Sequence, residues 1–299
     1  MSDTKISWAD KTWNMMGGCE PCSAGCANCA AARCASGRSL KNHPLYKGLT
    51  KNGKWTGEVR LCTDIGRDDI LEQPLHWRAG RKIFPAFMSD LFRAPFDFIA
   101  EVFGIMGQCP QHEFLVLTKQ IEDAHRWFRW LDQDEDRISS FYWQSAINGF
   151  LPNVHFGTSI STPDDLKNVK YLLQIPAAKR FISFEPLLED INAVELFVDD
   201  KGNTIIDYII IGAESKGAWP GRECQVEWIR SLVRQADAAG VGVHIKQMHL
   251  WRCKNCGNLF EKQQIEGWGC ECGAEDDEIK RVLVKNIKQF PADLQRRDI

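Results

Sequence analysis

A short segment near the start of the chain carries cysteines at the spacing of metal ligands. Cys22, Cys26 and Cys29 form a C-x3-C-x2-C pattern, and Cys19 precedes them. Thiolates are the standard ligands of iron–sulfur clusters, and three ligands for the four irons of a [4Fe–4S] cube leave one iron open. The pattern therefore predicts a cube that can bind a further small ligand at its open iron.

Zinc is the alternative metal for this segment. A structural zinc site needs a fourth protein ligand, and Cys34 follows Cys29 closely enough in the sequence to supply it. Four thiolates around one ion would leave no open position. The two interpretations therefore predict different chemistry, and a closed site would exclude an enzyme that needs the open iron.

A second group of cysteines lies near the end of the chain. Glycine permits a tight backbone around thiolates, so paired C-x2-C-G turns are typical of zinc ribbons. The second turn here is C-x-C-G, which leaves an auxiliary iron–sulfur cluster as the alternative. We expect Zn²⁺ in an inserted module that either staples a long loop or contacts nucleic acid or a partner. Its ligands are Cys253, Cys256, Cys270 and Cys272.

The composition excludes several classes of protein. The chain has 299 residues, 44% hydrophobic and 26% charged, with a formal net charge of −3. That charge argues against binding nucleic acid by bulk electrostatics. No apolar run approaches the roughly 18 residues of a membrane helix, and no secretory signal pattern opens the chain. Twelve cysteines in a reducing compartment indicate metal rather than disulfides. We expect a cytoplasmic protein with no membrane span.

Between the cysteine groups, short apolar runs alternate with amphipathic segments. Helical periodicity covers residues 97–108 and 225–239, and Thr162-Pro163 is typical of a helix start. Repeated strand–helix units predict a parallel sheet, either a barrel or a doubly wound sheet. The predicted strands are residues 83–88, 114–117, 154–159, 180–184, 208–212 and 241–245.

Polar residues follow every predicted strand, and this repetition favours the barrel. In a parallel barrel the carboxyl ends of the strands meet at one rim, where active sites are built. The sequence therefore predicts an α/β fold, a partial TIM-type (β/α)6-7 barrel. The rim residues are Ser89-Asp90, Thr118-Lys119, Ser159, Ser161, Glu185-Pro186, Glu214-Ser215 and Lys246-Gln247.

The sequence predicts that the chain is divided into three parts. Residues 1–250 form the predicted barrel with its cluster loop, residues 251–279 the zinc-ribbon-like insertion, and residues 280–299 a segment that returns to the barrel. Within the first part, residues 33–60 carry seven Lys or Arg against the single acid Glu58. This stretch indicates contact with the phosphates of a polyanion; the alternative is a solvated loop.

The motifs occur in the order of a known family. The chain resembles a phage- and bacterium-borne family of radical-SAM-like proteins (phage Gp-type proteins of unknown function), distantly related to spore photoproduct lyase. The resemblance spans most of the chain. The matching segments are KTWN (11–14), GC (18–19), GCANC (25–29), FMSDLF (87–92), VLTK (116–119), LPNV (151–154), FEPLL (184–188), IGAES (211–215) and IKQ (245–247).

The resemblance implies a radical S-adenosylmethionine (SAM) enzyme, so that the partial TIM-type barrel would be of the radical SAM type. In that superfamily the open iron chelates SAM, and an electron from a donor such as flavodoxin or ferredoxin cleaves a C–S bond. The family spacing C-x6-C-x2-C maps onto Cys19, Cys26 and Cys29, whereas spacing alone selects Cys22, so the first ligand stays open. Asn28 stands where radical SAM enzymes often have an aromatic residue near the adenine.

By the same resemblance, the polar rim would hold SAM. Ser89 and Asp90 are placed to meet its methionine amino group, and Ser159, Ser161 or Glu185 to meet its ribose hydroxyls. Carboxylates suit an ammonium group and vicinal hydroxyls as hydrogen-bond acceptors. The alternative for each carboxylate is a structural ion pair.

Three further residues are candidates for the catalytic step. Glu214 follows a predicted strand and can hold SAM or substrate, while Cys62 and Cys224 stand alone in the sequence. A thiol can donate a hydrogen atom to a product radical. A buried cysteine is otherwise a small hydrophobic residue.

Together these features predict abstraction of a hydrogen atom from a nucleic-acid-derived substrate. The resemblance favours a modified thymine in phage DNA, handled either by an isomerase of base hypermodification or by a lyase acting on a photolesion. A free nucleotide is the related possibility. The alternative class is a non-catalytic zinc protein that binds nucleic acid through its two cysteine groups.

Overall fold

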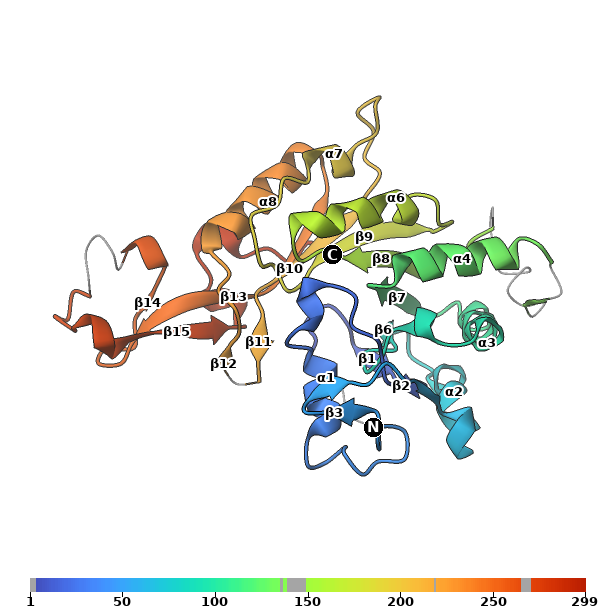
Figure 1. Ribbon diagram of the computed structural model, residues 1–299. Helices are drawn as coiled ribbons and strands as arrows, with labels where there is room; N and C mark the ends of the chain where they lie inside the picture. Colours follow the sequence, from blue (N-terminus) through green and yellow to red (C-terminus); the bar gives the residue numbers. More distant parts are fainter. Residues whose placement is uncertain (1–3, 135–136, 139–148, 218, 265–269) are drawn as a thin grey trace. The chain divides into compact units, whose positions relative to one another are not determined.

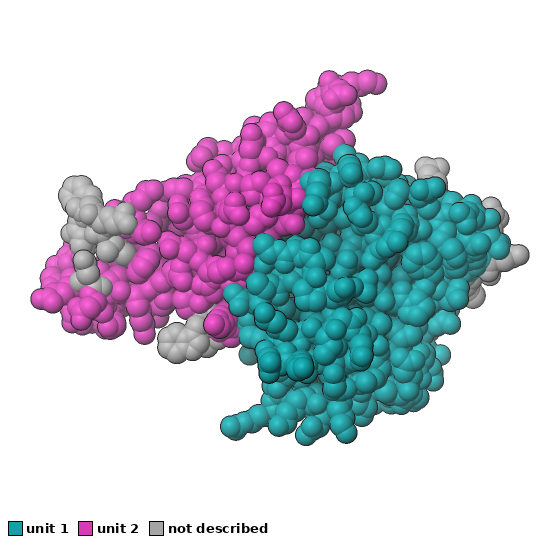
Figure 2. Space-filling model, viewed as in Figure 1, with its two compact units in different colours: residues 1–159, 167–183 teal, residues 160–166, 184–299 magenta. Residues whose placement is uncertain are grey.

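The computed structural model describes residues 4–134, 137–138, 149–217, 219–264 and 270–299 (Figure 1). The chain divides into two compact units, coloured separately in Figure 2. Unit 1 comprises Met1–Ser159 and Lys167–Ser183, and unit 2 comprises Ile160–Leu166 and Phe184–Ile299. Helices alternate with the strands of a large, mostly parallel sheet, which confirms the predicted α/β class, and most strand pairs of unit 2 are antiparallel.

The sheet of unit 1 is parallel throughout and has the order β1-β6-β7-β8-β9. Every residue of β8 is buried, so both of its faces are covered, as the near-continuous apolar runs of parallel strands require. The strands are β1 (Lys11–Trp13), β6 (Lys82–Pro85), β7 (Glu113–Thr118), β8 (Val154–Ser159) and β9 (Lys179–Phe184).

Aromatic side chains pack the helices of unit 1 together and against the sheet. Phe103 of α3 (Phe96–Gly107) stacks on Trp127 of α4 (Ile121–Leu131), with ring centroids 4.6 Å apart. Phe128 of α4 meets Phe156 of β8 at 5.6 Å. The remaining helices of this unit include α1 (Ala30–Ser36), α2 (Asp68–Leu71) and α6 (Val169–Leu172).

A small substructure, which we call the basic module (residues 30–60), follows the first cysteines. It contains α1 and the two-stranded sheet of β3 (Thr50–Lys51) and β4 (Lys54–Trp55), and β5 (Arg60–Leu61) pairs with β2 (Met16–Gly17) at its end. Leu45, Tyr46, Leu49 and Trp55 form its core with the alanines of α1. The segment therefore has a packed core of its own, and contact of its cations with phosphates stays a prediction.

Unit 2 is built on one long strand, β13 (Gly242–Cys253). Its first half pairs in parallel with β10 (Tyr208–Gly212), and its second half pairs antiparallel with β15 (Ile279–Val284) and β14 (Leu259–Phe260). Helix α8 (Val226–Ala238) packs on β13 and β10. The unit also contains α7 (Val194–Phe197) and the hairpin of β11 (Ser215–Lys216) and β12 (Trp219–Pro220).

Several predicted elements are confirmed, and some bounds differ. The predicted strands at 154–159 and 208–212 match β8 and β10 residue for residue. The predicted strand 241–245 is too short, because pairing with β15 extends β13 through Lys246-Gln247 to Cys253. Within the described residues of each unit, no closed barrel is formed. No described helix is long and apolar enough to cross a membrane.

Candidate functional site

The loop that carries the first cysteines is attached to the carboxyl ends of two parallel strands. The Ser89 hydroxyl, just after β6, donates to the carbonyl of Gly18, and the two residues also form a backbone bridge. Just after β7, the Gln120 amide donates to the carbonyl of Glu20 at 3.0 Å. Arg93 forms an ion pair of 2.6 Å with the Glu20 carboxylate. These contacts place the loop at the edge of a parallel sheet where α/β proteins bind ligands.

Two glycines allow the loop to pass close to the basic module. Gly18 has φ of 89°, and a Cβ there would lie 2.1 Å from the carbonyl oxygen of Glu58. A Cβ on Gly17 would lie 2.6 Å from the ring of Tyr46. Since any other residue would displace backbone or a buried ring, the path of the loop depends on this glycine pair.

The four thiols of the loop interact with one another. Cys22 donates a hydrogen bond to Cys26, which is the largest cause that lowers the pKa of Cys26, to about 4; the Lys119 ammonium acts in the same direction. Cys19 lies within electrostatic range of both Cys26 and Cys29, and burial together with nearby Asp90 raises its pKa. A thiolate is the form that binds metal, so the lowered pKa of Cys26 favours this residue as a metal ligand.

The sulfurs of this loop do not gather around one point as the ligands of a single zinc ion would. Tetrahedral Zn–S bonds of about 2.3 Å place thiolates about 3.8 Å apart, whereas cysteines that bind different irons of a cube stand farther apart. In the described part of the chain, the only group with three or more candidate ligand atoms mutually within 4.8 Å is C-terminal. Cys34, the proposed fourth zinc ligand, is exposed on α1.

Asp90 ties the ends of β6 and β7 together. It is buried, and its carboxylate accepts hydrogen bonds from the Thr118 hydroxyl at 2.7 Å and from the N–H groups of Lys119 and Phe92 at 2.9 and 3.2 Å. Burial raises the pKa of Asp90. The described contacts of Ser89 and Asp90 thus hold the cysteine loop and its neighbouring strand ends, and contact with the SAM amino group stays a prediction.

Two of the predicted ribose contacts, Glu185 and Ser161, belong to unit 2. Glu185 pairs with Lys246 at 2.7 Å and passes so close to Gly212 that a Cβ there would lie 2.7 Å from Oε1. Ser161 is fully buried, and no partner for its hydroxyl is found in the described structure. A buried hydroxyl without a partner is costly unless a ligand or water completes it. Ser159, at the end of β8 in unit 1, lies opposite Ser183 of β9.

Glu214 is held by a residue that the sequence did not single out. Its buried carboxylate accepts from the guanidinium of Arg222 at 2.5 Å and from the backbone N–H of Arg222 at 2.8 Å. His249 Nε2 donates to the Glu214 carbonyl at 2.9 Å, while its Nδ1 accepts from the Cys224 N–H at 3.1 Å. Burial lowers the pKa of His249. The polar strand end at Glu214 is therefore part of a structural network.

Replacement of Arg222 by alanine should destabilise unit 2. The substitution leaves a buried carboxylate without its cation, and breaking such a pair costs about 3 kcal/mol of unfolding free energy. Arg222→Lys keeps the positive charge but loses the bidentate geometry of the guanidinium, so we expect an intermediate loss of unfolding free energy. Urea unfolding followed by circular dichroism measures both variants, and an unchanged midpoint for Arg222→Ala would contradict the structural role of the pair.

The two candidate hydrogen-atom donors are both buried thiols, in different units. In unit 1 the backbone N–H of Cys62 donates to the carbonyl of Met15 at 2.8 Å. Burial raises the pKa of Cys62, and it raises the pKa of Cys224, in unit 2, to about 12. Both therefore keep the S–H bond at neutral pH, which a hydrogen-atom donor requires.

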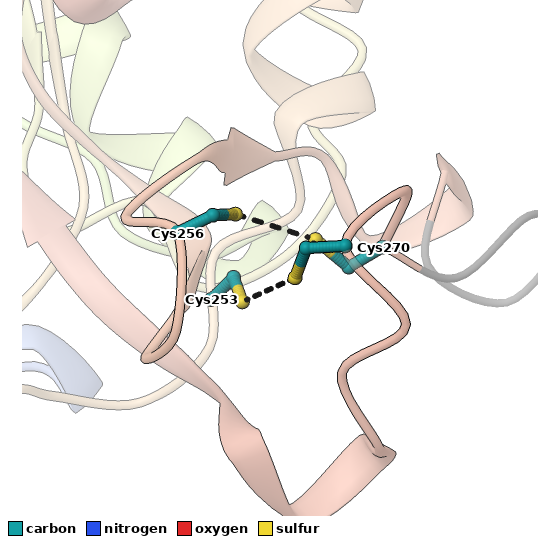
Figure 3. Close-up of side chains that lie close together, drawn as sticks. Cys253, Cys256 and Cys270 are labelled. Atoms are coloured by element: carbon teal, nitrogen blue, oxygen red, sulfur yellow. Dashed lines mark hydrogen bonds between the residues drawn. The ribbon is translucent and has the colours of Figure 1, made fainter.

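The second group of cysteines forms a compact four-sulfur site (Figure 3). The sulfurs of Cys253 and Cys272 lie 3.6 Å apart, those of Cys256 and Cys270 3.5 Å, and those of Cys270 and Cys272 3.2 Å. The backbone N–H of Cys256 is the largest cause that lowers the pKa of Cys253. This group can bind a metal such as zinc, since its sulfurs stand close to the spacing around one tetrahedral ion.

Comparison with known proteins identifies the family to which the chain belongs. Residues 3–288 match one protein family. No match was found among curated proteins or among solved structures. Because the match covers nearly the whole chain, this protein belongs to the family described as "Protein of unknown function (DUF5131)".

Proposed function

We propose that this chain is a radical SAM enzyme, built on a partial (β/α) barrel, that acts on a nucleic-acid-derived substrate. The observation that carries the proposal is the attachment of the cysteine loop to the carboxyl ends of β6 and β7 by Ser89, Gln120 and Arg93. Ligand sites of parallel α/β proteins lie at this edge. A loop of four interacting thiols there is suited to a catalytic cluster.

Three thiols of the loop would hold the cluster, and the fourth would fix the loop. A bound [4Fe–4S] cluster with one open iron would supply SAM binding and the electron that cleaves its C–S bond. Cys19, Cys26 and Cys29 would hold the cluster, because Cys19 lies within electrostatic range of both others. Cys22, which donates to Cys26 and contacts the Lys119 carbonyl at 3.6 Å, would fix the loop.

The basic module supports a polyanionic substrate. Its exposed cations are Arg38, Lys41, Lys47, Lys51 and Lys54. The core beneath them packs directly against Cys19 and Cys29. Phosphates held by these cations would keep a nucleic acid beside the cluster loop, although the net charge of the chain is negative. A modified thymine in phage DNA, or a photolesion, fits this placement.

Anaerobic reconstitution tests the proposed activity. Protein loaded with iron and sulfide should be brown, absorb at about 400 nm, and release 5′-deoxyadenosine when SAM and dithionite are added. Phage DNA should increase that yield. Protein that takes up iron but releases no 5′-deoxyadenosine under any condition would contradict the enzyme assignment.

The two branches of the activity differ in their need for a protein thiol. A rearrangement returns the hydrogen atom to the substrate radical, whereas a lyase quenches its product radical with a thiol. Activity that survives the joint replacement of Cys62 and Cys224 by alanine would favour the isomerase. Loss of product with 5′-deoxyadenosine release retained would favour the lyase.

One observation favours a second function, a non-catalytic zinc protein that binds nucleic acid. The C-terminal cysteines meet closely enough to hold zinc without any other cofactor. Colourless protein that contains zinc, takes up no iron on reconstitution and still binds DNA would support this alternative. The attachment of the N-terminal loop to strand ends argues against it, since a binding module needs no such placement.

A further inference from the structure

The exposed cations of the basic module are not engaged by acidic side chains. In the described part of the chain, no ion pair joins a carboxylate to any of five such residues, which are Arg38, Lys41, Lys47, Lys51 and Lys54. We propose that this module is a clamp for the backbone of duplex DNA, with the hairpin of β3 and β4 as its main contact. The proposal rests on the nucleic-acid-derived substrate proposed above and names the form in which that substrate is bound.

The two remaining cations of the module, Arg33 and Arg60, hold its backbone. Arg33 donates to the carbonyl of Asn28 at 2.6 Å. Arg60 donates to the carbonyls of Pro44 and Lys47 at 2.8 and 2.7 Å, which fixes the chain at Lys47. Both guanidinium groups therefore have structural partners, whereas the five exposed cations are available to an anion.

The hairpin of β3 and β4 presents two of these cations side by side. Its two-residue turn, Asn52-Gly53, has φ of 51° and 75°, as in the type I′ turns that favour these two residues. The register places Lys51 directly opposite Lys54, on the face away from buried Trp55. Like charges at such positions destabilise a strand pair. A bound phosphate would replace this repulsion by an attractive contact.

The acids around the module do not cancel its positive charge. Glu58 is the only acid of residues 30–60, and the longer stretch of residues 30–72 still holds eight basic against five acidic side chains. Among the acids that follow the module, Asp69 is paired with Arg67 at 2.6 Å. The carboxylates therefore leave an excess of positive charge, which attracts a polyanion.

The aromatic residues of the module favour a duplex over a single strand. Proteins that bind single strands stack the bases on exposed aromatic rings. Tyr46 and Trp55 are only 7% and 8% exposed, because their rings belong to the core that the module forms with α1. A duplex needs no stacking platform, since its bases stay paired and its phosphates face outward. The module therefore offers backbone contacts, which position a duplex without reading its sequence.

Fluorescence anisotropy of labelled probes tests the clamp in the full-length, reconstituted protein without SAM. The probes are a DNA duplex of about 20 base pairs, one of its strands alone, and polyglutamate of the same total charge. The duplex should bind at least about tenfold more tightly than the other two, because its charge density is the highest of the three. If all five exposed cations contact phosphates, the logarithm of the association constant should fall with the logarithm of salt concentration at a slope of about −4.5.

Two double variants provide the matched comparison. Lys51→Gln with Lys54→Gln should make the slope less steep by about 2 and weaken the binding of duplexes of any sequence alike. Lys167→Gln with Lys170→Gln removes the same charge from exposed positions at and just before α6, well apart from β3 in unit 1 (Figure 1), and should leave the slope unchanged. The hairpin variant should unfold at the same or a higher temperature than the unchanged protein, since it loses a like-charge pair.

Three results would overturn the proposal. They are absence of duplex binding, binding of the single strand or of polyglutamate at least as tight as that of the duplex, and equal changes of slope in the two double variants. Tight binding of polyglutamate would assign the module to an acidic protein instead. Because none of these measurements uses SAM or 5′-deoxyadenosine, failure of the clamp and failure of the radical SAM assignment remain distinguishable.

Discussion

Cys26→Ala is expected to remove the iron–sulfur cluster and all SAM cleavage. Cys26 has the most stabilised thiolate of the loop, because Cys22, Ser23 and Lys119 all lower its pKa. Loss of an outer-shell partner alone weakens metal sites by up to about 100-fold, so loss of a ligand should do more. Iron analysis, absorbance at about 400 nm and 5′-deoxyadenosine release measure the effect together.

Cys34→Ala is the matched control for that experiment. Cys34 lies on α1, eight positions further along the chain, and is exposed. A cube held by the loop should keep its full iron content in this variant. Iron retained in Cys26→Ala would contradict the assignment of Cys26 as a ligand. Metal lost equally in Cys34→Ala would favour a site of four thiolates that includes Cys34.

The first ligand is decided by a pair of single substitutions. If Cys19 binds iron, Cys19→Ala loses the cluster while Cys22→Ala keeps it but with a weakened thiolate at Cys26. The reverse result would assign Cys22, as the C-x3-C-x2-C spacing suggests. Both candidates lie within electrostatic range of Cys26, and Cys19 also lies within range of Cys29, so the two substitutions decide between them.

The sequence pattern correctly predicted two buried strands and the meeting of the C-terminal cysteines. The apolar runs at 154–159 and 208–212 became strands with the predicted bounds, because their residues are buried on both faces. The C-terminal cysteines meet as their spacing predicts, since glycine-containing turns bring such pairs together within a few residues. In both cases the determining interactions are close in sequence or depend on burial alone.

Long-range pairing explains what the sequence did not reveal. The short strand β1 is recognisable only through its pairing with β6, whose residues lie 72 positions later in the chain. Lys246-Gln247 resembles a strand end, yet β13 continues because β15 supplies a partner. The bond from Arg222 to Glu214 crosses the β11–β12 hairpin, and no local pattern marks either residue as its partner.

Removal of the C-terminal metal is expected to unfold the ribbon that carries β14 and β15. Purified protein should contain one zinc ion per chain at this site, and structural zinc contributes about 10–16 kcal/mol of apparent binding free energy. Among the described residues, the buried cluster around the cysteines consists of Cys253, Cys270 and Ile279, with Trp251 and Phe260 partly buried against it. A core of this size cannot hold the fold without the metal.

Hydrogen exchange of a Cys270→Ser variant measures this loss residue by residue. Amides of β13 from Met248 to Cys253 should lose protection, since their pairing with β15 depends on the closed site, whereas those paired with β10 should keep it. Cys34→Ser is the control, because it removes an exposed thiol from unit 1. Iron bound in place of zinc would identify an auxiliary cluster, although sulfurs 3.2 to 3.6 Å apart suit one ion. Full protection in the variant would instead show that the hydrogen bonds between β13 and β15 are sufficient to hold the two strands together. In that case the cysteines would not be needed to stabilise the ribbon.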